Sequence, residues 1–171
     1  MGVLPLRTFG DPVLREKSFP VTEINDELKM LVKDLEDTLH DLEGVGLAAP
    51  QIGVLKQVFV VDLGEGPVAY INTEIIAKEE EFQEEEGCLS VPPVRVSVKR
   101  YKKIKVKALN IDGKEEVFEA EGLLAKAIQH EVDHINGMLV IDRLDKEERS
   151  KALSELREVD LFLNKADDST S

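Results

Sequence analysis

The segment QHEVDH, from Gln129 to His134, constrains the structure of this chain more than any other. Apolar residues recur around it at helical spacing, which predicts a helix over residues 122–136 with Gly137 as its stop. Residues four apart on an α-helix differ by about 40° in azimuth, so His130 and His134 project from one face. The apolar residues around that face are Leu124, Ala127, Ile128 and Ile135. The charged residues Lys126 and Asp133 are expected on the other side of the helix.

Two buried imidazoles need partners for their ring nitrogens, and one cation supplies a partner to each. Glu131 lies about 100° around the helix from His130, close enough to reach a water on such an ion without binding the ion. This is the geometry of a general base in the HExxH pattern. The alternative is a helix with two satisfied histidines and a solvent-facing glutamate.

An ion held by two side chains needs a third ligand from elsewhere. His40 is expected on the polar side of a first helix, as a surface residue. Cys88, in the segment EGCLS, is the better candidate because Gly87 lets the backbone approach another element, although a lone cysteine is more often a small buried hydrophobe. Three ligands leave a position open to water, as in catalytic sites. A thiolate with two imidazoles suits Fe²⁺, Zn²⁺, Co²⁺ or Ni²⁺.

The remaining pattern predicts an α+β fold, with antiparallel strands around the metal-binding helix and a helix near each end. The first helix covers residues 25–42, capped by Asn25 and ended by Gly44, and an ordered loop follows over residues 44–53. Runs rich in valine and isoleucine predict strands, and Asp145 with Glu148 opens a third helix to about Leu163. The strands are expected at residues 57–63, 68–76, 94–98, 103–108 and 117–120.

Length and charge narrow the class of protein. A chain of 171 residues fits one domain, with a frayed tail over residues 164–171. A net charge of −13 disfavours a DNA-binding protein, and no apolar run is long enough to span a membrane. The N-terminus lacks a secretory signal pattern, so the chain is expected in the cytoplasm. The glutamates between Glu79 and Glu86 predict a solvated surface segment, and Glu86 could pair with Arg95 or Arg100.

Three separated motifs resemble one family in the same order: GVGLAAPQ at residues 44–51, EGCLS at residues 86–90 and QHEVDH at residues 129–134. The chain looks like a peptide deformylase over most of its length. The resemblance implies hydrolysis of the N-formyl group from the formylmethionine that begins new polypeptides, with release of formate. It also implies one divalent ion, most often Fe²⁺, with Zn²⁺, Ni²⁺ or Co²⁺ tolerated, in a bacterial-type cytoplasm or an organelle.

The same resemblance implies a role for each matching residue. Cys88, His130 and His134 would be the metal ligands, and Glu131 the acid and base. Gln51, through its side-chain amide, and Leu89, through its backbone N–H, would donate to the formyl oxygen, as suits preorganised stabilisation of developing charge.

Substrate contacts are predicted from the residues themselves. The extended stretch Gly44, Val45 and Gly46 is expected to pair with the substrate backbone, because glycines let another chain approach. Leu124 and Ile128 are expected to line the methionine pocket, unless both are plain core.

Two departures from the family bear on partners. Lys126 occupies a position where an apolar residue is usual, which implies a more polar pocket mouth. Some members dock on the ribosome through a basic C-terminal helix, and the mixed charge of this one disfavours that mode.

Three other functions are compatible with parts of the pattern. A metalloprotease would cleave internal peptide bonds rather than release formate. A degenerate domain would only bind peptide ends, which intact Glu131 and Gln51 disfavour. A structural zinc domain would unfold on chelation without ever turning over a substrate.

Overall fold

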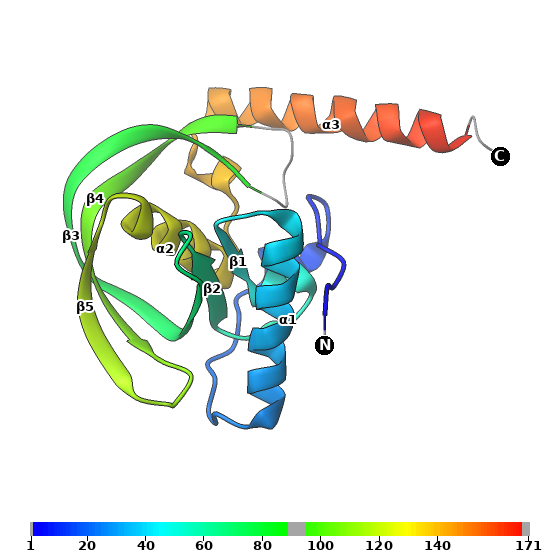
Figure 1. Cartoon of the computed structure of the whole chain (residues 1–171). Coiled ribbons are helices and arrows are strands. Elements are labelled where there is room, and N and C mark those ends of the chain that lie inside the picture. Colours follow the sequence, from blue (N-terminus) through cyan, green and yellow to red (C-terminus); the bar gives the residue numbers. More distant parts are fainter. Residues whose placement is uncertain (1, 89–94, 169–171) are drawn as a thin grey trace.

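The computed structural model describes residues 2–88 and 95–168, whose elements are drawn in Figure 1. A single five-stranded antiparallel sheet has the order β1-β2-β3-β4-β5, so each strand pairs with its neighbour in sequence. The strands are β1 (Gly46–Ala48), β2 (Val58–Asp62), β3 (Pro67–Gly87), β4 (Arg95–Leu109) and β5 (Glu115–Glu121), and the helices are α1 (Asp26–Leu42), α2 (Gly122–Ile135) and α3 (Lys146–Asp168). The predicted α+β class is confirmed.

The sheet curls around α2, which lies inside the bend formed by β3, β4 and β5 (Figure 1). Register shifts between Ile71 and Glu74, and between Ile75 and Ala77, interrupt the β3 ladder, and such irregularities bend strands. Apolar side chains from the sheet and from α2 form one core, which includes Phe59, Ile104 and Ile128. The sheet therefore holds α2 on its apolar side.

α1 packs on the sheet through a second core that includes Leu28, Leu35 and Leu39. The Asn25 side chain accepts a hydrogen bond from Leu28 N at 3.0 Å, as an N-cap should. The expected stop at Gly44 is wrong by one residue: Glu43 adopts the left-handed conformation, with a φ of 53°, and its N–H bonds to the end of the helix.

Two further expectations differ from the structure. Residues 44–53, expected as a loop, contain β1 and the 3₁₀ helix η2 (Ala49–Ile52), because this segment adds an edge strand to β2. β3 runs well beyond the strand expected at residues 68–76, and β4 joins the two strands expected at residues 94–98 and 103–108. The glutamate-rich part of β3 is a strand whose charges are balanced across the ladder by lysines of β4, a pairing that periodicity alone does not reveal.

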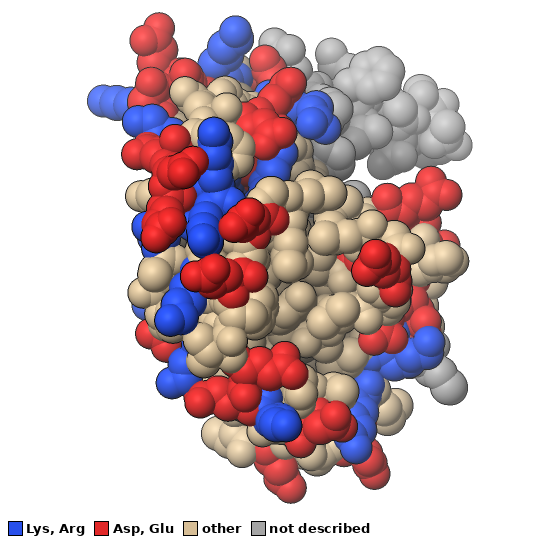
Figure 2. Space-filling model, turned by 60° about the vertical axis from the view of Figure 1, so that its left-hand side comes forward, with Lys and Arg blue, Asp and Glu red and all other residues tan. Residues whose placement is uncertain are grey.

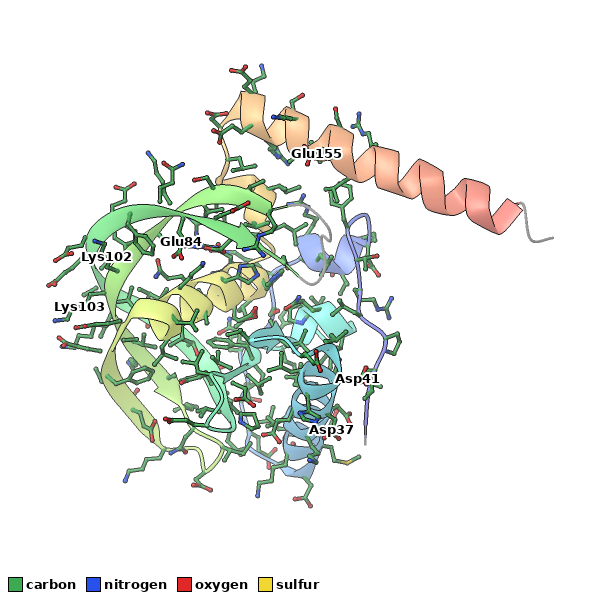
Figure 3. All side chains as sticks on the ribbon, turned by 45° about the horizontal axis from the view of Figure 1, so that its top comes forward. Asp37, Asp41, Glu84, Lys102, Lys103 and Glu155 are labelled. Carbon is green, nitrogen blue, oxygen red and sulfur yellow. The ribbon has the colours of Figure 1, made fainter. Side chains whose placement is uncertain are left out.

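Positively and negatively charged side chains are interspersed on the face of the molecule that Figure 2 shows. Lys99 pairs with Glu81 at 3.8 Å, and Lys103 pairs with Glu119 at 3.4 Å. Lys102 and Lys103 project outward from the sheet in Figure 3. The expectation of a solvated segment holds for the glutamates from Glu79 to Glu85, but Glu86 is buried.

The C-terminal helix α3 packs through its first half and then projects from the body of the molecule (Figure 1). Asp145 accepts a hydrogen bond from Glu148 N at 2.8 Å, as predicted for its start. Ala152 and Leu156 join a small core with Leu14 and Leu139. The helix runs to Asp168, beyond the end expected near Leu163. Among the described residues, no helix has the length and apolar character to cross a bilayer.

Candidate metal centre

A cavity of about 460 Å³ opens between α2, the end of β3 and the edge strand β1. The three elements come from distant parts of the sequence and correspond to the three motifs singled out above. Side chains and backbone from all of them form its wall, including Gly46, Gln51, Cys88, His130 and Glu131. The cavity therefore gathers the chemistry-bearing residues of the chain.

Cys88, His130 and His134 present one ligand atom each, and these atoms lie within 4.8 Å of one another. The Cys88 Sγ atom is 3.2 Å from His134 Nε2, which is 3.2 Å from His130 Nε2. The two histidines are one helical turn apart on α2, and Cys88 directly follows β3. The structure thus brings together the three residues that were predicted as ligands.

This donor set fits a cation. Burial and the neighbouring His130 lower the pKa of His134 well below its ordinary value. Burial also lowers the pKa of His130, but hydrogen bonds with Cys88 and Glu86 outweigh that effect and raise it. Two ring nitrogens that face each other at 3.2 Å cannot both hold a proton, whereas one divalent ion accepts a lone pair from each. A thiolate with two imidazoles is a ligand set of Zn²⁺, Fe²⁺ and similar ions.

A buried ionic network lies behind the ligands. Glu86 Oε1 is 2.8 Å from His130 Nδ1, and the same carboxylate receives two hydrogen bonds from Arg100, at 2.8 and 2.9 Å. Arg100 also donates to Asp133 at 2.7 Å, and Arg143 pairs with Asp133 as well. Burial raises the pKa of Glu86, but Arg100 and His130 outweigh it and bring the pKa down to about 2. The carboxylate is therefore ionised and fixes the orientation of the His130 ring.

Only part of this network is predictable from the sequence. Arg95 and Arg100 are the two partners predicted for Glu86. Arg100 forms the buried pair with Glu86, whereas Arg95 lies at the surface, 3.9 Å from Glu85. Asp133, expected on the solvent side of the helix, is instead buried beside Arg100. The correction has a physical reason: β4 supplies a buried cation, and the carboxylate of Asp133 neutralises it.

Glu131 lies beside the ligands and is only 2 % exposed, contrary to a solvent-facing role. Its Oε1 atom is 4.0 Å from His130 Nε2, and its Oε2 atom has no hydrogen-bond partner among the described residues. Burial raises the pKa of Glu131 to about 7. A Cβ atom on Gly46 would come within 3.1 Å of Glu131 Cγ, so the glycine makes room for this side chain. A carboxyl with a pKa near neutrality suits proton transfer in both directions.

Gln51 is held at the opposite wall by η2. Its Oε1 atom accepts a hydrogen bond from Ala48 N at 3.0 Å, which directs the Nε2 group toward Cys88 Sγ, 3.8 Å away. The amide donor is thus fixed next to the ligand atoms. Leu89, predicted as a second donor, lies outside the described residues.

Only some of the residues predicted to contact substrate line the cavity. Gly44, Val45 and Gly46 line it, but Leu124 and Ile128 do not. Ile128 is fully buried in the core under the sheet, and Leu124 packs against that core. The helical repeat explains the correction, because residues three, four and seven before His130 share its face. The residues of α2 on that face are Leu123, Lys126 and Ala127, and all three line the cavity.

Comparison with known proteins agrees with this geometry. The family model described as polypeptide deformylase matches residues 3–150. A peptide deformylase of Desulfitobacterium hafniense is 49% identical over 149 residues, covering 87% of this chain and 99% of the relative. Peptide deformylase 1 of Clostridium perfringens is 51% identical over 144 residues, covering 83% and 98%.

Solved structures show the same fold. The peptide deformylase of Legionella pneumophila superposes with a TM-score of 0.89 at 38% identity, covering 95% of this chain and 98% of that one. The Thermotoga maritima peptide deformylase gives a TM-score of 0.82 at 46% identity, covering 85% and 99%. With the match of the family model, these likenesses show that the chain belongs to the polypeptide deformylase family, whose members are metal-dependent hydrolases that remove formyl groups from nascent peptides.

Proposed function

We propose that Cys88, His130 and His134 hold one Fe²⁺ ion and that the cavity beside them takes the N-formylmethionine end of a new polypeptide. The observation that carries this proposal is the convergence of three ligand atoms within 4.8 Å next to a buried carboxyl. When bound, such an ion would activate water and polarise the formyl group. Zn²⁺, Ni²⁺ and Co²⁺ would fit the same donor set.

The edge strand β1 can form backbone hydrogen bonds with an extended substrate. It pairs with β2 along one edge only, as the first strand in the order of the described sheet. Its residue Gly46 and the preceding Gly44 and Val45 line the cavity. An extended peptide that adds to this edge would place its N-terminus at the ligand atoms.

Glu131 moves the proton in the proposed reaction. Water attacks the formyl carbon and gives a proton to Glu131, and the C–N bond then breaks as Glu131 returns that proton to the departing nitrogen. The products are formate and a free amino terminus. The pKa of about 7 supports both steps, since the carboxyl neither holds nor releases the proton too strongly.

Gln51 would stabilise the charge that develops on the formyl oxygen. Its Nε2 group is a neutral donor whose position is set by the bond from Ala48 N to its own carbonyl oxygen. A preorganised donor of this kind contributes ~3 kcal/mol to transition-state stabilisation. The backbone N–H of Leu89 is proposed as a second donor.

We propose that residues 1–171 form one catalytic domain that acts in a bacterial-type cytoplasm. Its substrate is made on the ribosome, but the side chains that the structure describes at the start of α3 do not form the basic face that RNA contact requires. The first turn of α3 carries charges of both signs, with Lys146, Glu147, Glu148 and Arg149 in succession. Direct docking through α3 is therefore not part of the proposal.

The test is formate release from an N-formylmethionyl tripeptide by protein purified without oxygen and loaded with Fe²⁺. The matched substrate lacks the formyl group, and mass spectrometry of both reports any internal cleavage. We expect stoichiometric formate with the formylated peptide only, and loss of turnover in Glu131→Gln. Internal cleavage of the unformylated peptide would instead assign the protein to the metalloproteases, and metal-dependent folding without formate would leave a structural site.

A further inference from the structure

One face of α2 lines the cavity from its mouth to the ligands. Lys126, Ala127 and His130 lie three, four and seven residues after Leu123, so the four residues form a single stripe. Leu123 and Ala127 are apolar, whereas Lys126 places a cation between them. The part of the wall that α2 forms beyond His130 is therefore apolar with one charged interruption.

Lys126 bridges the gap between α2 and the end of β3. Its Nζ atom is 3.3 Å from the carbonyl oxygen of Glu85 and 3.4 Å from Glu84 Oε2. Figure 3 shows Glu84 on the strand beside α2. Both distances lie beyond the usual 2.7–3.2 Å of an N–H···O bond. An ammonium group has three donors, so these two loose contacts leave it able to donate to a third group.

The position of Lys126 matches the reach of the first side chain of the substrate. It stands one helical turn before His130, which is ~6 Å along the axis. A methionine side chain that begins next to the reacting formyl amide spans about the same length, since ~1.5 Å separates successive heavy atoms. Its sulfur would therefore approach the Lys126 end of the stripe.

Given the deformylase activity proposed above, we propose that Lys126 is a specificity-determining residue that lets the enzyme accept N-formyl peptides whose first residue is methionine sulfoxide. The sulfoxide oxygen accepts a hydrogen bond from the Lys126 ammonium. The reaction itself is unchanged: the formyl C–N bond breaks, water supplies the oxygen to formate, and the sulfur keeps its oxygen. A wholly apolar pocket would reject the added polar atom by ~10²-fold.

The test compares kcat/KM for N-formyl tripeptides that differ only in the first residue, which is methionine, methionine sulfoxide or norleucine. The wild-type enzyme is expected to use the sulfoxide within ~10-fold of methionine. Lys126→Met should widen that ratio at least ~10-fold and improve norleucine relative to methionine. Glu84→Gln replaces the anionic partner of Lys126 with a weaker, neutral acceptor, so it should shift the ratio toward the sulfoxide.

Ratios on one enzyme preparation cancel differences in metal occupancy and in the folded fraction. Lys102→Met, at an exposed lysine that does not line the cavity, is the matched control and should leave the ratio as in the wild type. An unchanged ratio in Lys126→Met, or wild-type discrimination of ~10²-fold against the sulfoxide, would overturn the inference. Absence of turnover with formylmethionine in every variant would refute the deformylase function itself, which is a separate outcome.

Discussion

The buried carboxyl of Glu131 should make the metal-free protein lose stability as the pH rises. Its pKa is about 7 in the folded protein, against an ordinary value of 4.5, because burial penalises the ionised form. The folded state therefore favours the protonated carboxyl. The contribution of this carboxyl to the free energy of unfolding is therefore fully present below pH 4.5 and is lost as the pH rises through about 7.

The magnitude follows from the two pKa values. At 1.36 kcal/mol for each pKa unit, their separation corresponds to ~3 kcal/mol above pH 8. Glu131→Gln keeps the size of the side chain and cannot ionise, so it removes this penalty. Linkage gives a penalty of about 1.4 kcal/mol at pH 5.5, so the advantage of the variant should grow by about 2 kcal/mol between pH 5.5 and pH 8.5.

The assay is thermal and urea unfolding of chelator-treated protein, followed by far-ultraviolet circular dichroism because the chain has no tryptophan. A gain of ~2 kcal/mol corresponds to a rise of ~4–8 °C in the relative Tm for a domain of this size. Glu84→Gln, at an exposed carboxylate on β3, is the control and should show no such growth. A difference between Glu131→Gln and wild type that is the same at both pH values would refute the reasoning.

Three further predictions concern the same centre. Glu86→Gln should weaken metal binding by about 10–100-fold in chelator competition, because His130 loses an ionised partner at 2.8 Å, whereas exposed Glu81→Gln should not; equal affinities would contradict this role. Arg100→Met should destabilise the metal-free protein by ~3–5 kcal/mol in urea unfolding, because the buried carboxylate of Glu86 loses its guanidinium partner and Asp133 loses one of its two; a loss below ~1 kcal/mol would argue against the network. Gln51→Leu should lower kcat by ~10²–10³-fold in the formate assay with metal content unchanged, and a change confined to KM would exclude the proposed donor.

The sequence predicted those features that a short repeat determines. His130 and His134 fall on one helix face whatever surrounds them, so their pairing follows from spacing alone. Asn25 and Asp145 cap helices through local hydrogen bonds, and the structure contains both. The position of Cys88 beside the histidines rested on elimination and on the resemblance, because no local rule brings residues so distant in sequence together.

The remaining features depend on tertiary packing. Leu124 and Ile128 were assigned to the pocket because they are apolar, but the curl of the sheet over α2 decides which apolar residues face the core. Asp133 has the appearance of a surface residue until Arg100 of β4 is placed against it. Lys126 also lines the cavity, although its charge favoured the outer face; its spacing of four residues from His130 places it on the same face as that histidine. A charged residue can be placed inside only when its partner is known, and that partner lies on another element.

The distribution of the ligands along the chain has a consequence for biosynthesis. Cys88 and His134 are separated by 46 residues, and the strands β4 and β5 lie between them. During translation the thiol emerges well before either imidazole, and closing that long segment carries an entropic cost that only the completed sheet and helix offset. Capture of the ion should therefore come late in folding. An enzyme that matures other new polypeptides would then acquire its own activity only after most of its own chain has been synthesised.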